Sequence, residues 1–250
     1  MRILVTFAVE AEFAPWRKLR PFEKQTDGLA AYFAARIGGA DVNVVLTGVG
    51  GKSAWLETTK IVWDSDVDVC VSSGLAGALR AEYHLGDILA ARVVQAISSK
   101  RVIDSDAKLI QLAEEYGARA VGSFYSADRV IGSASEKSEL GRRADAVEME
   151  SGEVLYEASA FGARVIAIRA ISDAVDEDLP LDFNSVMTPA GEVSIPKVLG
   201  EVVRHPMSAP ALVRFGKQSR TAAEKLGVFL DSYLEGVVSS LGATIGAAPR

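Results

Sequence analysis

Short apolar runs that lie between helical segments limit most strongly what this chain can fold into. Ile3–Phe7 and Val67–Ser72 are apolar at nearly every position rather than at alternate ones, so both faces of the strands they predict must be covered. Further strands are predicted at 30–37, 42–46, 88–94, 118–125 and 164–171, and helices at 10–19 (interrupted by Pro15), 53–63, 105–115 and 151–161, the last followed by a terminating Gly162. This alternation predicts an α/β fold: a three-layer sandwich with a mixed, mostly parallel sheet flanked by helices.

The length and the even composition predict one domain. The chain has 250 residues, of which 49% are hydrophobic, enough for one sizeable core. We expect a single domain over 1–240, with a core at 1–183 and a C-terminal helical extension at 184–240. In the extension, several prolines precede an amphipathic stretch at about 212–234, and 241–250 is small and polar enough to be a flexible tail.

The composition excludes several classes of protein. The net charge is −6, and the 27 basic residues are scattered rather than gathered into the basic footprint that a nucleic-acid partner needs. The single Cys70 allows no internal disulfide and no cysteine-rich zinc site, and neither His84 nor His205 has a second ligand at helical spacing, so we expect no metal. There is neither a stretch long enough for a transmembrane segment nor a visible secretory signal, so we expect the cytoplasm.

Two glycine-rich turns follow predicted strands, where ligands of such sheets bind. Gly48–Gly51 precedes a predicted helix, but a P-loop needs a glycine where Leu46 stands, and a dinucleotide fingerprint needs one where Ser53 stands. What remains is a tight turn whose N–H groups bind an anion or a ribose hydroxyl, or which simply joins a strand to a helix. The small residues of Ser72–Gly77 fit either a close approach of a ligand to the backbone or an ordinary turn.

Acidic residues also follow predicted strands. Glu148 and Glu150 flank Met149, and in an extended stretch both carboxylates would point the same way. A buried carboxylate needs partners, and a pair of ribose hydroxyls would serve, with Met149 against the sugar; acids at a helix start are the alternative. Asp173 is either a catalytic acid at a strand end or a helix cap, and Glu12 is either functional or part of a solvated loop.

Taken in order, these motifs resemble those of the nucleoside phosphorylase and nucleosidase superfamily, of the methylthioadenosine/S-adenosylhomocysteine nucleosidase type. The resemblance runs from Met1 to about Phe183. It rests on 8–12 (AVEAE), 47–50 (TGVG), 74–77 (GLAG), 86–88 (GDI), 147–150 (VEME) and 171–173 (ISD). It implies an enzyme that cleaves the N-glycosidic bond of a small-molecule purine nucleoside, needs no metal or cofactor, and forms a homodimer.

The resemblance also implies roles for single residues. Glu12 would activate the attacking water, Asp173 would protonate N7 of the purine, and Glu150 would bind the ribose hydroxyls. Burial would favour the protonated form of Asp173, whereas Glu12 must stay ionised. Further substrate-site residues are Met149 and Glu148 beside the sugar, Ser172 and Arg169 as supports of Asp173, Val130 and Ile131 beside the base, and Ala76, Gly77 and Gly48 in the small-residue turns.

Some features depart from the pattern of the adenine nucleosidases. Leu75 stands where they carry a serine near the catalytic acid, and Val130 stands where they carry an aromatic residue near the base, so we expect a different purine pocket. The GLAG sequence at 74–77, the pair Glu150-Ser151 and the proline-rich tail are similar to the hopanoid-associated branch. This similarity implies that the 5′ side of the pocket opens toward a large apolar group.

Hydrolysis and phosphorolysis are both open to this superfamily. Glu10 and Glu12 stand where the phosphorylases carry basic residues, and carboxylates there would repel phosphate, so we expect hydrolysis. A non-catalytic nucleoside-binding protein and a ribose-binding enzyme of other chemistry are the alternatives. The presence of both Glu12 and Asp173 favours an enzyme.

Overall fold

The computed structural model describes residues 1–27, 30–64, 66–186, 188, 197 and 208–245. The strands are β1 (Arg2–Phe7), β2 (Glu23–Asp27), β3 (Ala30–Ile37), β4 (Ala40–Leu46), β5 (Val69–Ser72), β6 (Leu75–Ala78), β7 (Ile88–Ala96), β8 (Arg101–Asp104), β9 (Arg119–Ser126), β10 (Ala146–Glu148) and β11 (Arg164–Asp173). The helices are α1 (Glu10–Leu19), α2 (Gly51–Asp64), α3 (Ala107–Glu115), α4 (Ala134–Leu140), α5 (Ser151–Ala160), α6 (Phe183–Val186) and α8 (Ala209–Ile245).

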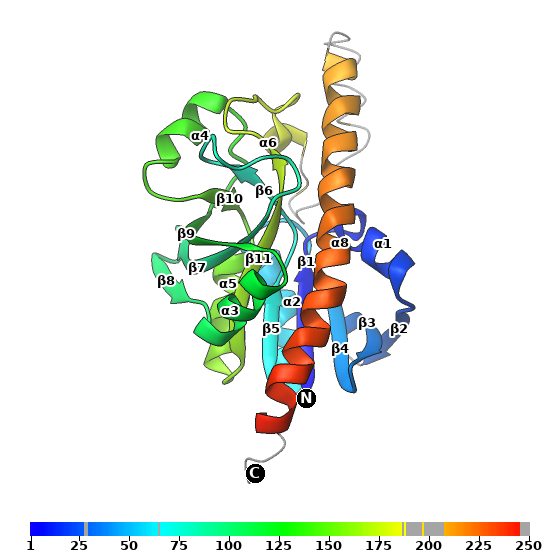
Figure 1. The fold of residues 1–250 in the computed structure, drawn as a ribbon. Helices are drawn as coiled ribbons and strands as arrows, with labels where there is room; N and C mark the ends of the chain where they lie inside the picture. The colour runs from blue at the N-terminus through cyan, green and yellow to red at the C-terminus, as the bar shows by residue number, and fades with distance from the viewer. Residues whose placement is uncertain (28–29, 65, 187, 189–196, 198–207, 246–250) are drawn as a thin grey trace.

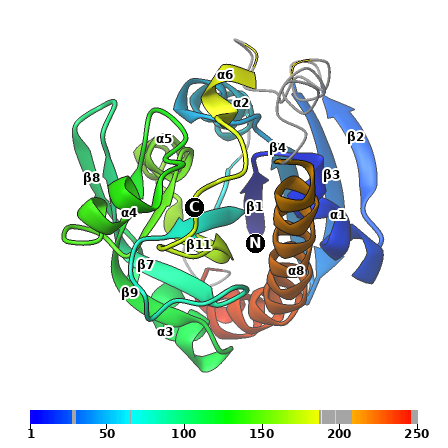
Figure 2. The same cartoon turned by 90° about the horizontal axis from the view of Figure 1, so that it is seen from above.

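The strands form one mixed sheet in the order β2-β3-β4-β1-β5-β11-β6-β10-β9-β7-β8. The central run from β4 to β6 is parallel, and β2, β3 and β8 are antiparallel to their neighbours. A mixed sheet flanked by helices is confirmed, and α2 and α5 lie on one side of it while α8 and α3 lie on the other (Figure 2).

One part of the sheet departs from the predicted three-layer sandwich. β11 pairs successively with β5 at 164–167, with β7 at 167–170 and with β6 at 170–173. Since β6, β10, β9 and β7 are neighbours in the sheet, these four strands and β11 form a closed ring. The predicted three-layer sandwich did not include this ring, because sheet closure depends on strand twist and pairing, which residue periodicity does not record.

The unbroken apolar runs are explained by burial on both faces. Ile3, Val5 and Phe7 pack into the core beneath α8, whereas Leu4 packs with Cys70 into the core beneath α2 and α5. Cys70 is buried in β5, as its apolar neighbours predicted. Each parallel strand therefore supplies side chains to two cores, which is why it carries no polar face.

The C-terminal extension is dominated by one long helix. α8 has 37 residues and runs along the length of the molecule (Figure 1). It is tied to α1 by hydrogen bonds from Trp16 Nε1 and Arg20 Nε to Asp231 Oδ1, at 3.0 and 2.7 Å. The helix continues past the predicted start of the tail at 241: residues 241–245 are helical, and Leu241 is buried. Residues 246–250 of the tail, and 189–196 and 198–207 of the extension, lie outside the described residues.

Several local features differ from expectation. Helix α1 continues through Pro15, and α2 begins at Gly51 rather than at Ser53. β6 was missed because its small residues resemble a turn, and α4 was missed because its polar residues show no apolar stripe. None of the described helices could cross a membrane, and no group of three His, Cys, Asp or Glu side chains in the described ranges could hold a metal ion.

Candidate active site

A cavity of about 840 Å³ lies where β1, β6, β10 and β11 meet α1 and the N-terminal half of α8. The carboxyl ends of β1, β10 and β11 open into it, as expected for a ligand site of a parallel sheet. Most of the candidate residues line it: Glu12, Ala76, Gly77, Val130, Ile131, Glu148, Met149, Glu150, Ser172 and Asp173. Gly48 and Arg169 do not.

Glu12 is held at the cavity wall by backbone N–H groups from two segments. Its Oε2 accepts hydrogen bonds from Ala8 (3.0 Å) and Val9 (3.4 Å), and its Oε1 accepts one from Leu75 (3.0 Å). Gly74 permits this approach, because at its φ of +145° a Cβ would stand 3.2 Å from both carboxylate oxygens. Burial raises the pKa of Glu12, against the effect of these hydrogen bonds. A carboxylate with a raised pKa is a stronger proton acceptor, which suits a general base.

Glu148 is hydrogen-bonded within the protein to the start of α5 and to Arg169. Its Oε2 accepts hydrogen bonds from the N–H groups of Glu150 (3.0 Å) and Ser151 (2.8 Å) at the start of α5, and from the guanidinium of Arg169 (2.6 Å). Arg169 is 1% exposed and also donates to the carbonyl of Ser72 at 2.8 Å. These contacts fit the alternative of an acid at a helix start, although Glu148 also lines the cavity. Arg169 supports Glu148 rather than Asp173, and the resemblance was misleading on that point.

Glu150 presents its carboxylate to the cavity. β10 ends at Glu148, so the two acids do not share one extended segment. Glu150 Oε1 accepts a hydrogen bond from Gly50 at 2.8 Å, and its Oε2 lies 3.9 Å from Arg169. The turn before α2 thus orients a carboxylate through the N–H group of Gly50. Burial, and then the charge of Glu148, raise the pKa of Glu150 to about 7.

Asp173 ends β11 where the register with β6 shifts, between Ile171 and Asp173. The hydroxyl of Ser172 donates to Asp173 Oδ1 at 2.7 Å, a contact that fits the supporting role implied by the resemblance. Gly77 of β6 is required beside it, because a Cβ there would stand 2.9 Å from Asp173 Oδ2. The glycines at the two ends of the GLAG sequence therefore make room for one acid each.

Lys137 is a functional candidate that sequence reasoning missed. It lies in α4, its side chain is 0% exposed, and its ammonium is ion-paired with Asp173 Oδ2. In the sequence it stands among Ser, Glu and Leu residues, as a solvated lysine would. No local signal could have placed it beside an acid 36 residues away.

The segment expected beside the base is fastened to the loop that follows β11. The side-chain amide of Asn184 accepts a hydrogen bond from Val130 N–H (2.8 Å) and donates one to the Val130 carbonyl (2.9 Å). Leu179 N–H donates to the Gly132 carbonyl at 2.8 Å. Val130, Ile131 and Leu179 line the cavity together.

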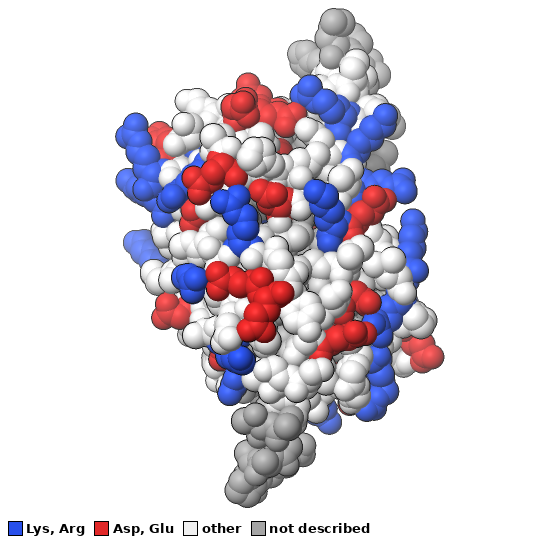
Figure 3. All heavy atoms as spheres, viewed as in Figure 1, with Lys and Arg blue, Asp and Glu red and all other residues white. Residues whose placement is uncertain are grey.

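Beyond the carboxylates the cavity wall is largely apolar. α1 supplies Ala11, Ala14, Pro15 and Leu19, α6 supplies Phe183, and α8 supplies Phe215 and Val228. Phe183 and Phe215 are in ring contact, with centroids 5.5 Å apart. On the face shown in Figure 3, acidic and basic side chains are interspersed without a continuous basic patch.

The fold and this cavity define a superfamily. The model of the phosphorylase superfamily matches residues 2–203, and the chain belongs to that superfamily. The resemblance drawn from the motifs is thereby confirmed, and with it the expectation of an enzyme.

Individual relatives are nucleosidases and hydrolases. The chain is 27% identical over 198 residues to a 5′-methylthioadenosine/S-adenosylhomocysteine nucleosidase of Actinobacillus succinogenes, across 69% of this chain and 85% of that protein. It shares its fold with the corresponding Helicobacter pylori nucleosidase bound to butyl-thio-DADMe-Immucillin-A, with a TM-score of 0.72, 22% identity and coverage of 94% and 98%. The futalosine hydrolase of Helicobacter pylori gives a TM-score of 0.71, 21% identity and coverage of 94% and 97%.

Proposed function

We propose that this chain is a nucleosidase that hydrolyses the N-glycosidic bond of a purine nucleoside. The observation that carries the proposal is that Glu12, Glu150 and Asp173 line one cavity, each with a different set of partners. The membership of the phosphorylase superfamily and the names of the relatives support it.

Each carboxylate has a role that its surroundings suit. Cleavage passes through an oxocarbenium-like state in which the purine leaves with the electrons of the C1′–N9 bond. Glu150, oriented by Gly50, accepts hydrogen bonds from the ribose hydroxyls. Glu12 takes a proton from the attacking water, and a proton from Asp173 reaches N7 and neutralises the leaving base.

Water is the nucleophile that suits this site. A phosphate beside the ribose would need N–H donors or cations, but the N–H groups of Ala8, Val9 and Leu75 donate to Glu12, and that of Gly50 donates to Glu150. Of the basic residues in the cavity lining, Arg129 pairs with Glu136 and Arg220 pairs with Glu224. The lining acids, which are Glu12, Glu148, Glu150, Asp173 and Glu224, would also repel a phosphate dianion. We therefore assign hydrolysis rather than phosphorolysis.

We also propose that the substrate is an adenosine with a large apolar 5′ substituent. The cavity volume of about 840 Å³ is near the upper end of the range of small-molecule pockets. Its extension between α1 and α8 offers apolar side chains, Leu19, Phe215 and Val228 among them, to whatever follows the 5′ carbon. A bound alkyl chain would gain about 0.8 kcal/mol for each buried CH₂ group.

The test is release of free base from adenosine, methylthioadenosine, S-adenosylhomocysteine and 5′-alkyl adenosines of increasing length, with and without phosphate. We expect adenine without phosphate, with kcat/KM rising with alkyl length. Glu12→Gln should abolish release, whereas Glu10→Gln, whose carboxylate pairs with Arg17 at 2.7 Å, is the matched control. Release only in the presence of phosphate would contradict hydrolysis, and no preference for longer chains would contradict the apolar substituent.

The homodimer and the cytoplasmic location stay predictions. Exposed apolar side chains on α2 and α5 are where we place the contact between two copies, since Trp63 is 72% exposed and stacks edge-on with the exposed Phe161. Sedimentation of the wild type and of Trp63→Glu tests this, because a dimer that uses this surface should dissociate in the variant. A dimer that is unaffected would place the contact elsewhere.

A further inference from the structure

Lys137 is the one residue of α4 whose side chain is completely buried. Its ammonium donates to the Ala174 carbonyl at 3.1 Å, to the Glu177 carbonyl at 2.9 Å, and to the carboxylate of Asp173. These three acceptors use all three N–H groups of the ammonium. The lysine is therefore fully satisfied in its charged form.

A role in fastening the loop after β11 explains only two of these contacts. Burying an ammonium costs several kcal/mol, which an apolar side chain at the same position would avoid. The third contact goes to Asp173 Oδ2, the oxygen that stands over Gly77 at the cavity wall. Ser172 occupies the other oxygen, so both oxygens of Asp173 have partners within the protein.

This arrangement bears on the proton that a leaving purine needs. The carboxylate of Asp173 is ion-paired with the Lys137 ammonium, and an ion-paired carboxylate has no proton of its own to give. The proton needed by the leaving group must come from a neighbour of Asp173. Its two side-chain donors are the Ser172 hydroxyl and the Lys137 ammonium, and the ammonium is much the stronger acid.

We propose that Lys137 is the proton source for purine departure and acts through Asp173. The inference rests on the proposed function. One N–H bond of the ammonium breaks and its proton moves to Asp173; the O–H bond of Asp173 then breaks as the N7–H bond forms, while the C1′–N9 electron pair moves into the purine. Water adds to C1′ and its proton goes to Glu12. Lys137 is left neutral. The starting protonation states return when Glu12 releases its proton to solvent and Lys137 takes one up from solvent.

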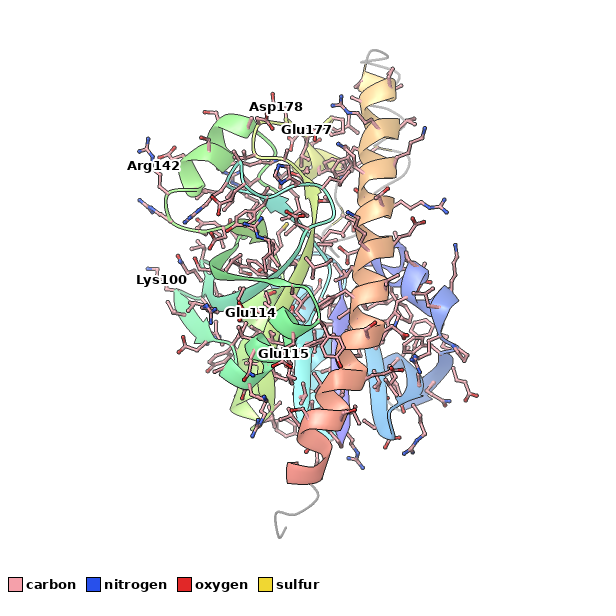
Figure 4. The ribbon with its side chains drawn as sticks, viewed as in Figure 1. Lys100, Glu114, Glu115, Arg142, Glu177 and Asp178 are labelled. Carbon is pink, nitrogen blue, oxygen red and sulfur yellow. The ribbon has the colours of Figure 1, made fainter. Side chains whose placement is uncertain are left out.

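The charged groups around the pair have other partners. Glu177 and Asp178 follow Asp173 on the loop at the end of the molecule near α4 (Figure 4). The Glu177 carboxylate pairs with Arg214 at 2.8 Å, and Asp178 accepts a hydrogen bond from Ala134 N–H at 2.7 Å. Glu136 of α4 pairs with Arg129, Glu148 pairs with Arg169, and Glu12 and Glu150 share the cavity with Asp173. Lys137 is thus directed to Asp173 alone among these acids.

The test compares two leaving groups in the full-length protein. Adenine needs a proton to leave, whereas the nitrophenolate of 4-nitrophenyl riboside does not. We expect Lys137→Met to lower the rate of adenine release by about 10²-fold or more and to change nitrophenyl riboside cleavage much less. Lys108→Met, on the exposed side of α3, is the matched control and should alter neither rate.

A second variant guards against a defect in folding. Lys137→Ala leaves space for an added amine, and methylammonium should restore adenine release in proportion to its concentration, with no effect on nitrophenyl riboside. Equal losses on both substrates, or no rescue, would make Lys137 a structural residue and overturn the proposal while hydrolysis stands. Wild-type protein that releases no base from any nucleoside would remove the proposed function and this inference together.

Discussion

Replacing Glu150 by glutamine should stabilise the fold and impair its activity. Burial raises the pKa of Glu150 from 4.5 to about 7, so the folded protein holds a proton there that the unfolded chain releases. Because the folded pKa is the higher one, the contribution of this group to stability is complete below pH 4.5 and is lost as the pH rises through 7. The difference of about 2.5 pKa units corresponds to about 3 kcal/mol.

The net gain is smaller, because glutamine also loses a favourable contact. The hydrogen bond from Gly50 N–H can persist to the amide oxygen, and the attraction to Arg169 at 3.9 Å is already contained in the pKa of about 7. The bond from Met149 N–H at 3.3 Å is lost, and we subtract about 1 kcal/mol for it. At pH 8 the variant should therefore be more stable by about 2 kcal/mol, and the advantage should disappear near pH 4.

Urea unfolding at pH 4, 6 and 8 measures this difference directly. Glu12 is present in both proteins, and its charge is one of the causes of the raised pKa of Glu150, so its repulsion is part of the difference that is measured. Glu114→Gln on exposed α3 (Figure 4) is the control and should stay within about 0.5 kcal/mol at every pH. A variant that is less stable than the wild type at pH 8, or equally stabilised at pH 4 and pH 8, would refute the reasoning.

Three further changes test the packing and the cavity. Arg169→Met leaves Glu148 buried without its cation and should lower the free energy of unfolding by about 3–5 kcal/mol. Arg164 is half-exposed, so Arg164→Met should lower it by less than about 1 kcal/mol, and thermal unfolding compares the two variants. Gly227→Ala puts a Cβ 3.0 Å from the Trp16 backbone and should lower the melting temperature of the protein. The control Gly216→Ala meets nothing within 4 Å and should stabilise α8 by about 0.5–1 kcal/mol through its higher helix propensity. Equal effects of the two changes on the melting temperature would count against tight packing of α1 on α8. Phe215→Asp should lower kcat/KM for long-chain 5′-alkyl adenosines at least tenfold and leave adenosine nearly unchanged, and an equal loss on both would show that this end of the cavity does not bind the 5′ substituent.

The sequence predicted the fold class because burial on two faces leaves a strong local record. β1 and β5 are apolar at consecutive positions, and the structure shows their residues alternating between two cores. It did not predict the closed ring, since the pairing of β11 with three strands depends on long-range register. It underestimated α8, whose burial continues to Leu241 because the helix packs against the sheet core over most of its length.

For the candidate site, the sequence by itself determined which acids would meet. Glu12 and Glu150 come after β1 and β10, Asp173 ends β11, and the carboxyl ends of these strands open into one cavity. Only the tertiary structure decided what each acid contacts: Glu148 pairs with Arg169, Glu150 accepts from Gly50 N–H, and Asp173 pairs with Lys137. The reason is that the state of a buried carboxylate depends on the nearest charge and N–H donors in space, and these come from segments far apart in the chain.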